Sequence, residues 1–129
     1  MISPYKSDSG AQVPWEYLPG AAGTYQAGQL LKVTAGKLAV VTAASTTTPP
    51  YLCMADITVT ADELVPVTRI QDDMIYETEL SAAAADAKIG SKLQVAAGGT
   101  QVNAAAEGSF EVTYLDNTAA GSRVLGRFL

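Results

Sequence analysis

Histidine is absent from the 129 residues of this sequence, and cysteine occurs once, as Cys53. Histidine is the side chain whose ordinary pKa lies nearest neutral pH, so its absence weakens general acid–base catalysis at that pH. A single cysteine cannot form an intramolecular disulfide, and without histidine it lacks the usual partner that activates a nucleophilic thiol. Within the apolar stretch YLCMADI, we therefore predict that Cys53 is a small buried side chain.

Charge is also scarce, because charged residues make up 16% of the chain and typical soluble domains contain roughly 25%. The eight Lys and Arg residues are scattered, and 13 Asp and Glu residues bring the net charge to −5. Nucleic acids and anionic membrane surfaces are bound through clustered basic side chains. The sequence therefore predicts neither a nucleic acid nor a membrane as a direct partner.

Long apolar runs are missing as well. None approaches the 18 or so residues that a membrane span requires, and the start, MISPYKSDSG, lacks the apolar core of a signal peptide. We expect a soluble protein that is made without export. A chain of this length fits one domain with its own core.

The carboxylates are the remaining candidates for chemistry. Glu77 and Glu79 share one face of an alternating stretch, which places their Cα atoms about 6.6 Å apart, near the separation used by some glycosidases. No pocket is evident between them, and we interpret them as a solvated strand face. Three further pairs with side-chain oxygens lack the spacing of a calcium loop and are interpreted as turns: Asp62–Glu63, Asp72–Asp73 and Asp116–Asn117. We predict a protein without catalytic site, metal or cofactor.

What the sequence does contain is one motif written twice. The pattern G-x-x-L-x-V-x-A-G-x-x-x-V-x-x-A-A occupies residues 28–44 and again residues 90–106. Apolar residues two apart on both sides of a glycine predict a β-hairpin in each copy, with Gly36 supplying the positive φ of the first turn. The stretches that follow, 51–70 and 110–129, also correspond if a three-residue gap is allowed. Two similar halves are expected to complete one core.

Between the copies, the alternation from Met74 to Leu80 predicts a strand. Ser81 is positioned to cap a short Ala-rich helix that ends near Gly90, and 60–63 has capping-box form but leaves space for a turn alone. The overall prediction is an all-β domain, a compact barrel or sandwich of eight or nine short strands with one or two short helical turns.

Residues 1–27 differ from the rest in their proline and glycine content and little periodicity. We predict an extended N-terminal arm, followed by a single β domain over residues 28–129. Two alternatives remain for its large side chains: they fold back on their own domain, or they dock on another subunit. These candidate contact residues are Tyr5, Val13, Trp15, Tyr17 and Leu18.

The spacing of glycines and apolar residues resembles that of head decoration (cement) proteins of tailed bacteriophages. The residues that carry the resemblance are Ala27, Gly28, Leu30, Leu31, Val33, Gly36, Leu38 and Val40, with Ile89, Gly90, Leu93, Val95 and Gly98 in the second half. The resemblance covers roughly residues 25–129 and contains no residue-level binding motif.

This resemblance implies a β-tulip domain, often trimeric, that binds the major capsid protein on the outside of a mature capsid and ties neighbouring subunits together. The expected location is the virion, after synthesis in the bacterial cytoplasm. The alternatives are another phage structural component, such as a tail-tube or spike-associated domain, and a carbohydrate-binding or adhesive domain. The last would need an exposed aromatic platform, for which Trp15, Tyr17 and Tyr25 are the candidates. An enzyme would need a pocket that converges on Glu77 and Glu79.

Overall fold

A computed structural model describes residues 1–8 and 14–129, which contain 13 β-strands and no helix. The strands are β1 (Ser3–Ser7), β2 (Glu16–Pro19), β3 (Gly23–Tyr25), β4 (Leu30–Thr34), β5 (Lys37–Val40), β6 (Tyr51–Cys53), β7 (Ile57–Val59), β8 (Leu64–Arg69), β9 (Met74–Glu79), β10 (Lys92–Val95), β11 (Val102–Asn103), β12 (Phe110–Leu115) and β13 (Arg123–Phe128). The all-β prediction is confirmed. The strands outnumber the predicted eight or nine, chiefly because residues 1–27 contribute β1, β2 and β3.

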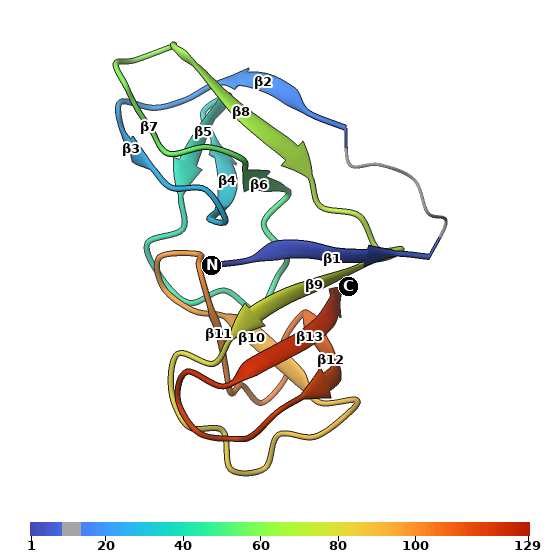
Figure 1. Cartoon of the computed structure of the whole chain (residues 1–129). Helices are drawn as coiled ribbons and strands as arrows, with labels where there is room; N and C mark the ends of the chain where they lie inside the picture. Colours follow the sequence, from blue (N-terminus) through green and yellow to red (C-terminus); the bar gives the residue numbers. More distant parts are fainter. Residues whose placement is uncertain (9–13) are drawn as a thin grey trace.

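The strands form three sheets whose named strands pair antiparallel (Figure 1). A six-stranded sheet has the order β1-β9-β13-β12-β10-β11, a five-stranded sheet the order β2-β8-β6-β4-β5, and β3 pairs with β7. The edges of the five-stranded sheet approach each other at one parallel bridge between Gly20 and Leu38. The sheet curls there without closing, so the predicted barrel is open.

The two halves of the sequence pair their strands in the same pattern. In the first half β4 pairs with β6 and β6 with β8, and in the second half β10 pairs with β12 and β12 with β13. The successive paired residues are Leu31, Tyr51 and Arg69 in the first half and Leu93, Phe110 and Phe128 in the second. This correspondence keeps the three-residue gap that the sequence alignment required.

Both copies of the repeated motif form hairpins, but the hairpins differ in register. In the first, Thr34 pairs with Lys37 around a two-residue turn. That turn needs positive φ at both central residues, and Ala35 and Gly36 have φ of 51° and 78°. In the second, Val95 pairs with Val102 and the loop between the strands is longer. Identical spacing in the sequence therefore does not produce identical turns.

Strand β9 follows its predicted alternation, whereas the predicted helix after it is wrong. Met74, Tyr76 and Thr78 are buried, and the residues between them are half-buried. Residues 81–90 form turns instead of a helix. A ten-residue helix is marginal by itself, and distant partners take its backbone donors: the N–H of Ala84 bonds to Thr118 O and that of Gly90 to Val112 O, both at 2.8 Å.

Two apolar cores lie on opposite faces of the five-stranded sheet. Leu30 and Leu52 join the first core, while Leu31 and Cys53, their neighbours in β4 and β6, join the second. Successive residues of a strand point to opposite faces, so these two strands form a wall between the cores. The first core contains an edge-to-face aromatic group, in which the centre of the Phe128 ring lies 5.2 Å from that of Tyr76 and 5.0 Å from that of Phe110.

In residues 1–8 and 14–129 no helix is long and apolar enough to cross a membrane.

Candidate interaction surface

The described part of the N-terminal segment supplies one edge strand to each large sheet. β1 pairs with β9 at the edge of the six-stranded sheet, and β2 pairs with β8 at the edge of the five-stranded sheet (Figure 1). Proline is tolerated at sheet edges, which explains how Pro4 and Pro19 fit into these strands. In the described residues of this single chain, β1, β2 and β3 of the segment pair with strands of its own domain.

The predicted contact residues divide into exposed and packed side chains. Tyr5, Trp15 and Tyr17 remain 53%, 52% and 59% exposed. Leu18 is half-buried and packs against the second core, and Val13 lies outside the described residues. The sequence therefore pointed to three side chains that stay accessible although the backbone around them is paired.

Trp15, Tyr17 and Leu64 form a surface that we call the aromatic edge. Tyr17 lies directly opposite Pro66 in the β2–β8 register, so it shares a sheet face with Pro66 and with Leu64, two residues earlier. Trp15 lies just before the first residue of β2. Leu64 is 55% exposed. The sequence analysis missed Leu64, because it begins the apolar stretch LVPV and such a stretch is typical of a buried strand.

The hydrogen bonding of β2 determines which of its backbone groups face outward. Gly20 donates its N–H to Glu63 O at 3.0 Å, and Met54 donates its N–H to Pro66 O at 3.0 Å. The Pro66 backbone is thus turned toward β6, and in an antiparallel ladder bonded pairs alternate with unbonded pairs. Tyr17, opposite Pro66, therefore directs both its N–H and its C=O to the outer edge of β2. We call this the free edge, because no other strand in residues 1–8 and 14–129 pairs with it.

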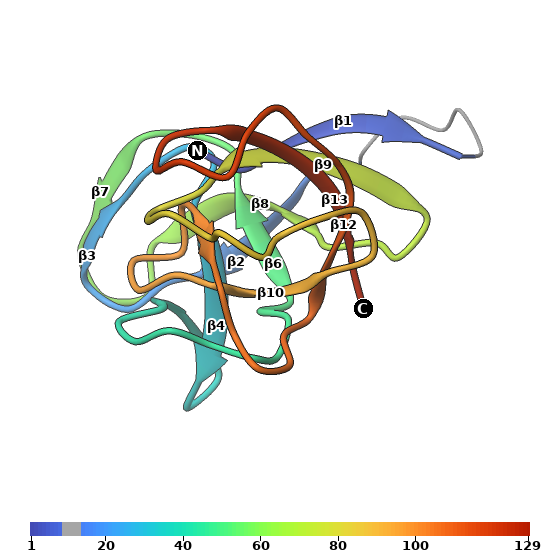
Figure 2. The same cartoon turned by 90° about the horizontal axis from the view of Figure 1, so that it is seen from below.

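A second exposed group surrounds Arg123 on the six-stranded sheet, where β1, β9 and β13 run side by side (Figure 2). The guanidinium carbon of Arg123 lies 5.5 Å from the centre of the Tyr5 ring and 6.0 Å from that of Tyr114. Its Nε donates to Glu77 at 2.7 Å, and this bond raises the pKa of the arginine. The hydrogen bond from Tyr114 to Asp116 raises the pKa of the phenol. Tyr5 is therefore held by its own domain.

Two β-bulges position these tyrosines. The β1–β9 register shifts between Pro4 and Lys6, which leaves Tyr5 as the extra residue, and the β12–β13 register shifts just before Tyr114. A bulge bends its strand and re-aims the neighbouring side chain. Two residues beyond the first bulge, Asp8 accepts two hydrogen bonds from Arg127 at 2.9 and 3.1 Å, which lower the pKa of the aspartate.

The carboxylates considered for catalysis are occupied separately. Glu77 pairs with Arg123, and Glu79 accepts a hydrogen bond from the amino group of Met1 at 3.0 Å. Among the residues that the structure describes, no three His, Cys, Asp or Glu side chains gather as metal ligands would. Cys53 is fully buried, its thiol donates to Ala55 O at 3.1 Å, and burial raises its pKa. The prediction of a buried cysteine is confirmed.

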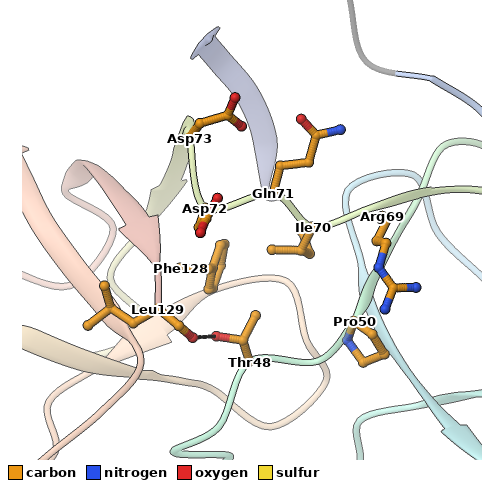
Figure 3. A pocket seen from close by; sticks show the side chains of 9 residues that line it. All are labelled: Thr48, Pro50, Arg69, Ile70, Gln71, Asp72, Asp73, Phe128 and Leu129. Atoms are coloured by element: carbon orange, nitrogen blue, oxygen red, sulfur yellow. Dashed lines mark hydrogen bonds between the residues drawn. The ribbon is translucent and has the colours of Figure 1, made fainter. Parts of the chain in front are cut away.

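One pocket lies where the β8–β9 connection meets the last strand (Figure 3). Asp72 and Asp73 line one side of it, and the ring of buried Phe128 lies at its base. Arg69, on the other side, points away from both aspartates and donates to the hydroxyl of Tyr51 at 2.9 Å. The pocket combines carboxylates with apolar walls, and its arginine is engaged by a tyrosine.

Tyr25, the third candidate for a carbohydrate platform, belongs to the second core. Its side chain is buried, and its hydroxyl donates to the carbonyls of Ala21 and Leu38. The exposed aromatic residues of this region are thus Trp15 and Tyr17.

No protein-family model matches the sequence, and no curated protein is significantly similar to it.

Proposed function

We propose that this chain is a viral structural protein that binds the outside of an assembled tailed-phage capsid and bridges neighbouring capsid subunits without catalysis. The observation that supports this proposal best is the aromatic edge. Trp15, Tyr17 and Leu64 are each more than half exposed, and they lie on or near β2, whose outer edge pairs with no other strand that the structure describes. Exposed large apolar groups at such a position are typical of protein–protein contacts.

The scaffold suits a binding function because the aromatic edge is attached to a packed core. Leu18 anchors β2 from the opposite face, so Tyr17 is presented with little freedom of the backbone. Tyr and Trp are frequent anchors of interfaces, since they combine a large apolar area with a polar group and few rotatable bonds. A pre-positioned anchor loses less conformational entropy on binding than a disordered arm would.

The proposal also includes a homotrimer, in line with the resemblance to decoration proteins. One aromatic edge is a small contact, and three linked copies raise the effective concentration at the second and third sites. Binding to the assembled capsid and not to its dissociated subunits would stabilise the capsid by about 2.7 kcal/mol per site when the free protein is at 100 times its Kd.

The test has two steps. Light scattering behind a sizing column gives the mass of the purified protein, for which we expect three times 13.3 kDa. Gradient co-sedimentation with mature, expanded capsids of the phage that encodes the chain is then expected to show saturable binding, and unexpanded procapsids of the same phage serve as the control. Absence of the chain from both the capsid fraction and purified virions would overturn the proposal. A ring or an open polymer would favour the tail component instead.

A further inference from the structure

We propose that the free edge of β2 is a docking site for an extended strand of the partner protein, and that this strand places a basic side chain opposite Glu16. The inference rests on the proposed function, because it assumes that the partner is a protein. It goes further by defining the chemistry of the partner segment: apolar residues that alternate with Lys or Arg.

The backbone of β2 provides the docking groups. The N–H and C=O of Tyr17 point to the free edge, as the register with Pro66 requires. An unpaired edge of this kind pairs readily with an added strand, which gains main-chain hydrogen bonds. Apolar side chains of that strand would lie against Trp15 and Tyr17 on one face of the sheet.

The other end of β2 is closed to such a strand. Pro19 has no N–H to donate, and the N–H of Gly20 already bonds to Glu63 O. Gly20 also forms the parallel bridge to Leu38. The docked strand must therefore pair with the first part of β2, at Glu16 and Tyr17.

Glu16 gives the site its charge preference. It lies on the face opposite Tyr17, is exposed, and pairs with no cation among the residues described. Because its backbone groups point toward β8, Glu16 would form an unbonded pair with a docked antiparallel strand, the geometry in which facing side chains lie closest. A carboxylate covered in this way requires an opposite charge, and a Lys or Arg supplies it.

Glu16 and Pro19 also disfavour a second copy of the chain as the occupant. Antiparallel pairing of two β2 strands centred on Glu16 would place two carboxylates directly opposite each other, which is destabilising. Pairing centred on Tyr17 would place Trp15 opposite Pro19, which lacks the donor for that rung. These two symmetric registers therefore each carry a defect that a different, basic strand avoids.

The experiment uses the fluorescence of Trp15, the one tryptophan of the chain. The probes are two blocked peptides, Val-Lys-Val-Lys-Val and Val-Glu-Val-Glu-Val, titrated at low salt. For the wild type we expect a saturable change in emission and a preference of about three- to tenfold for the Lys peptide. Glu16→Lys should reverse the preference, while Glu107→Lys, the same charge change at an exposed glutamate in a distant loop, should retain it.

Three results would overturn the inference: no saturable change with either peptide up to millimolar concentration, an unchanged preference in Glu16→Lys, or a concentration-dependent dimer formed through Trp15. Capsid co-sedimentation separates this inference from the proposed function. If wild type and Glu16→Lys bind capsids equally, the docking site is wrong and the function stands. If the wild type binds the Lys peptide but no capsid, the function is wrong and the docking site stands.

Discussion

Strands β1 and β2 come from the same N-terminal segment and both lie at sheet edges, yet the two edges are built differently. β1 is fixed at both ends and in its middle. Ile2, before the strand, is fully buried, and Asp8, after it, accepts two hydrogen bonds from Arg127. In the strand itself, the Tyr5 ring stacks on Arg123. β2 is anchored by Leu18, while its aromatic side chains face solvent. The difference indicates that β1 is tied into the fold at more points than β2, and it is at β2 that we propose the partner binds.

The largest expected effect is on stability, at the β1 end. Ile2→Ala removes a fully buried side chain of the first core and is expected to lower the free energy of unfolding by about 2–5 kcal/mol. The matched change at β2, Leu18→Ala, removes a half-buried side chain and should cost clearly less. Urea denaturation of both variants measures the difference. Equal losses would mean that β2 is as much a part of the fold as β1.

The next effect concerns binding, at the β2 edge. Tyr17→Ala is expected to weaken capsid binding by about 2 kcal/mol, roughly 30-fold in Kd, and to change the free energy of unfolding by less than about 0.5 kcal/mol, as exposed substitutions usually do. Tyr114→Ala, the same change at an exposed tyrosine of the other sheet, is the control and should bind as wild type does. Capsid binding by Tyr17→Ala at wild-type strength would exclude the aromatic edge as the contact.

A proline scan of β2 tests the backbone directions that distinguish its two sides. Glu16→Pro removes an N–H that the alternation of the ladder directs to Val67 and should cost about 1–3 kcal/mol of stability, because a buried carbonyl loses its donor. Tyr17→Pro, one residue later, removes an N–H that faces solvent and should cost less than about 1 kcal/mol. Thermal unfolding measures both. The reverse order would show that Tyr17 bonds to β8, and the docking site would then be lost.

How much of this contrast was visible in the sequence depends on the range of the interactions. The alternation of Met74, Tyr76 and Thr78 correctly predicted β9, and Gly36 correctly predicted the turn between β4 and β5, because both signals are local. The Ala-rich stretch at 81–90 was wrongly predicted as a helix. Its backbone instead bonds to Thr118 and Val112, which lie far away in the sequence and give no local signal. Local propensity is a weak prior that such contacts override.

The N-terminal segment shows the same limit. Its proline and glycine content led to the prediction of an extended arm, but proline is compatible with edge strands, in which it costs no ladder bond on the solvent side. Trp15 and Tyr17 were identified because large aromatic residues are conspicuous in a polar segment. The stacking of Tyr5 on Arg123 could not be predicted, since it joins the two ends of the chain across a sheet whose order the sequence does not reveal.

The smallest effect returns to β1 and to the ion pair that holds its end. The hydrogen bonds from Arg127 keep the pKa of Asp8 below its usual value, so the folded state favours the charged carboxylate. A group with a lowered pKa in the folded state stabilises the protein above its unfolded pKa, and that stabilisation is lost as the pH falls through the folded value. The loss should therefore begin near pH 4, the ordinary value of an aspartate, and continue below it.

Asp8→Asn should remove this contribution at pH 7, and its difference from the wild type should shrink as the pH falls below about 4, so the variant has a flatter pH dependence than the wild type. Asp86→Asn is the control, because Asp86 is exposed and makes no ion pair with another described residue. Urea denaturation between pH 2 and pH 7 measures the difference, which 1 M salt should reduce, since both partners are partly exposed and ions screen them. Identical pH dependence in Asp8→Asn and wild type would mean that the ion pair between Asp8 and Arg127 does not stabilise β1. Burial of Ile2 and pairing with β9 would then account for the position of the strand.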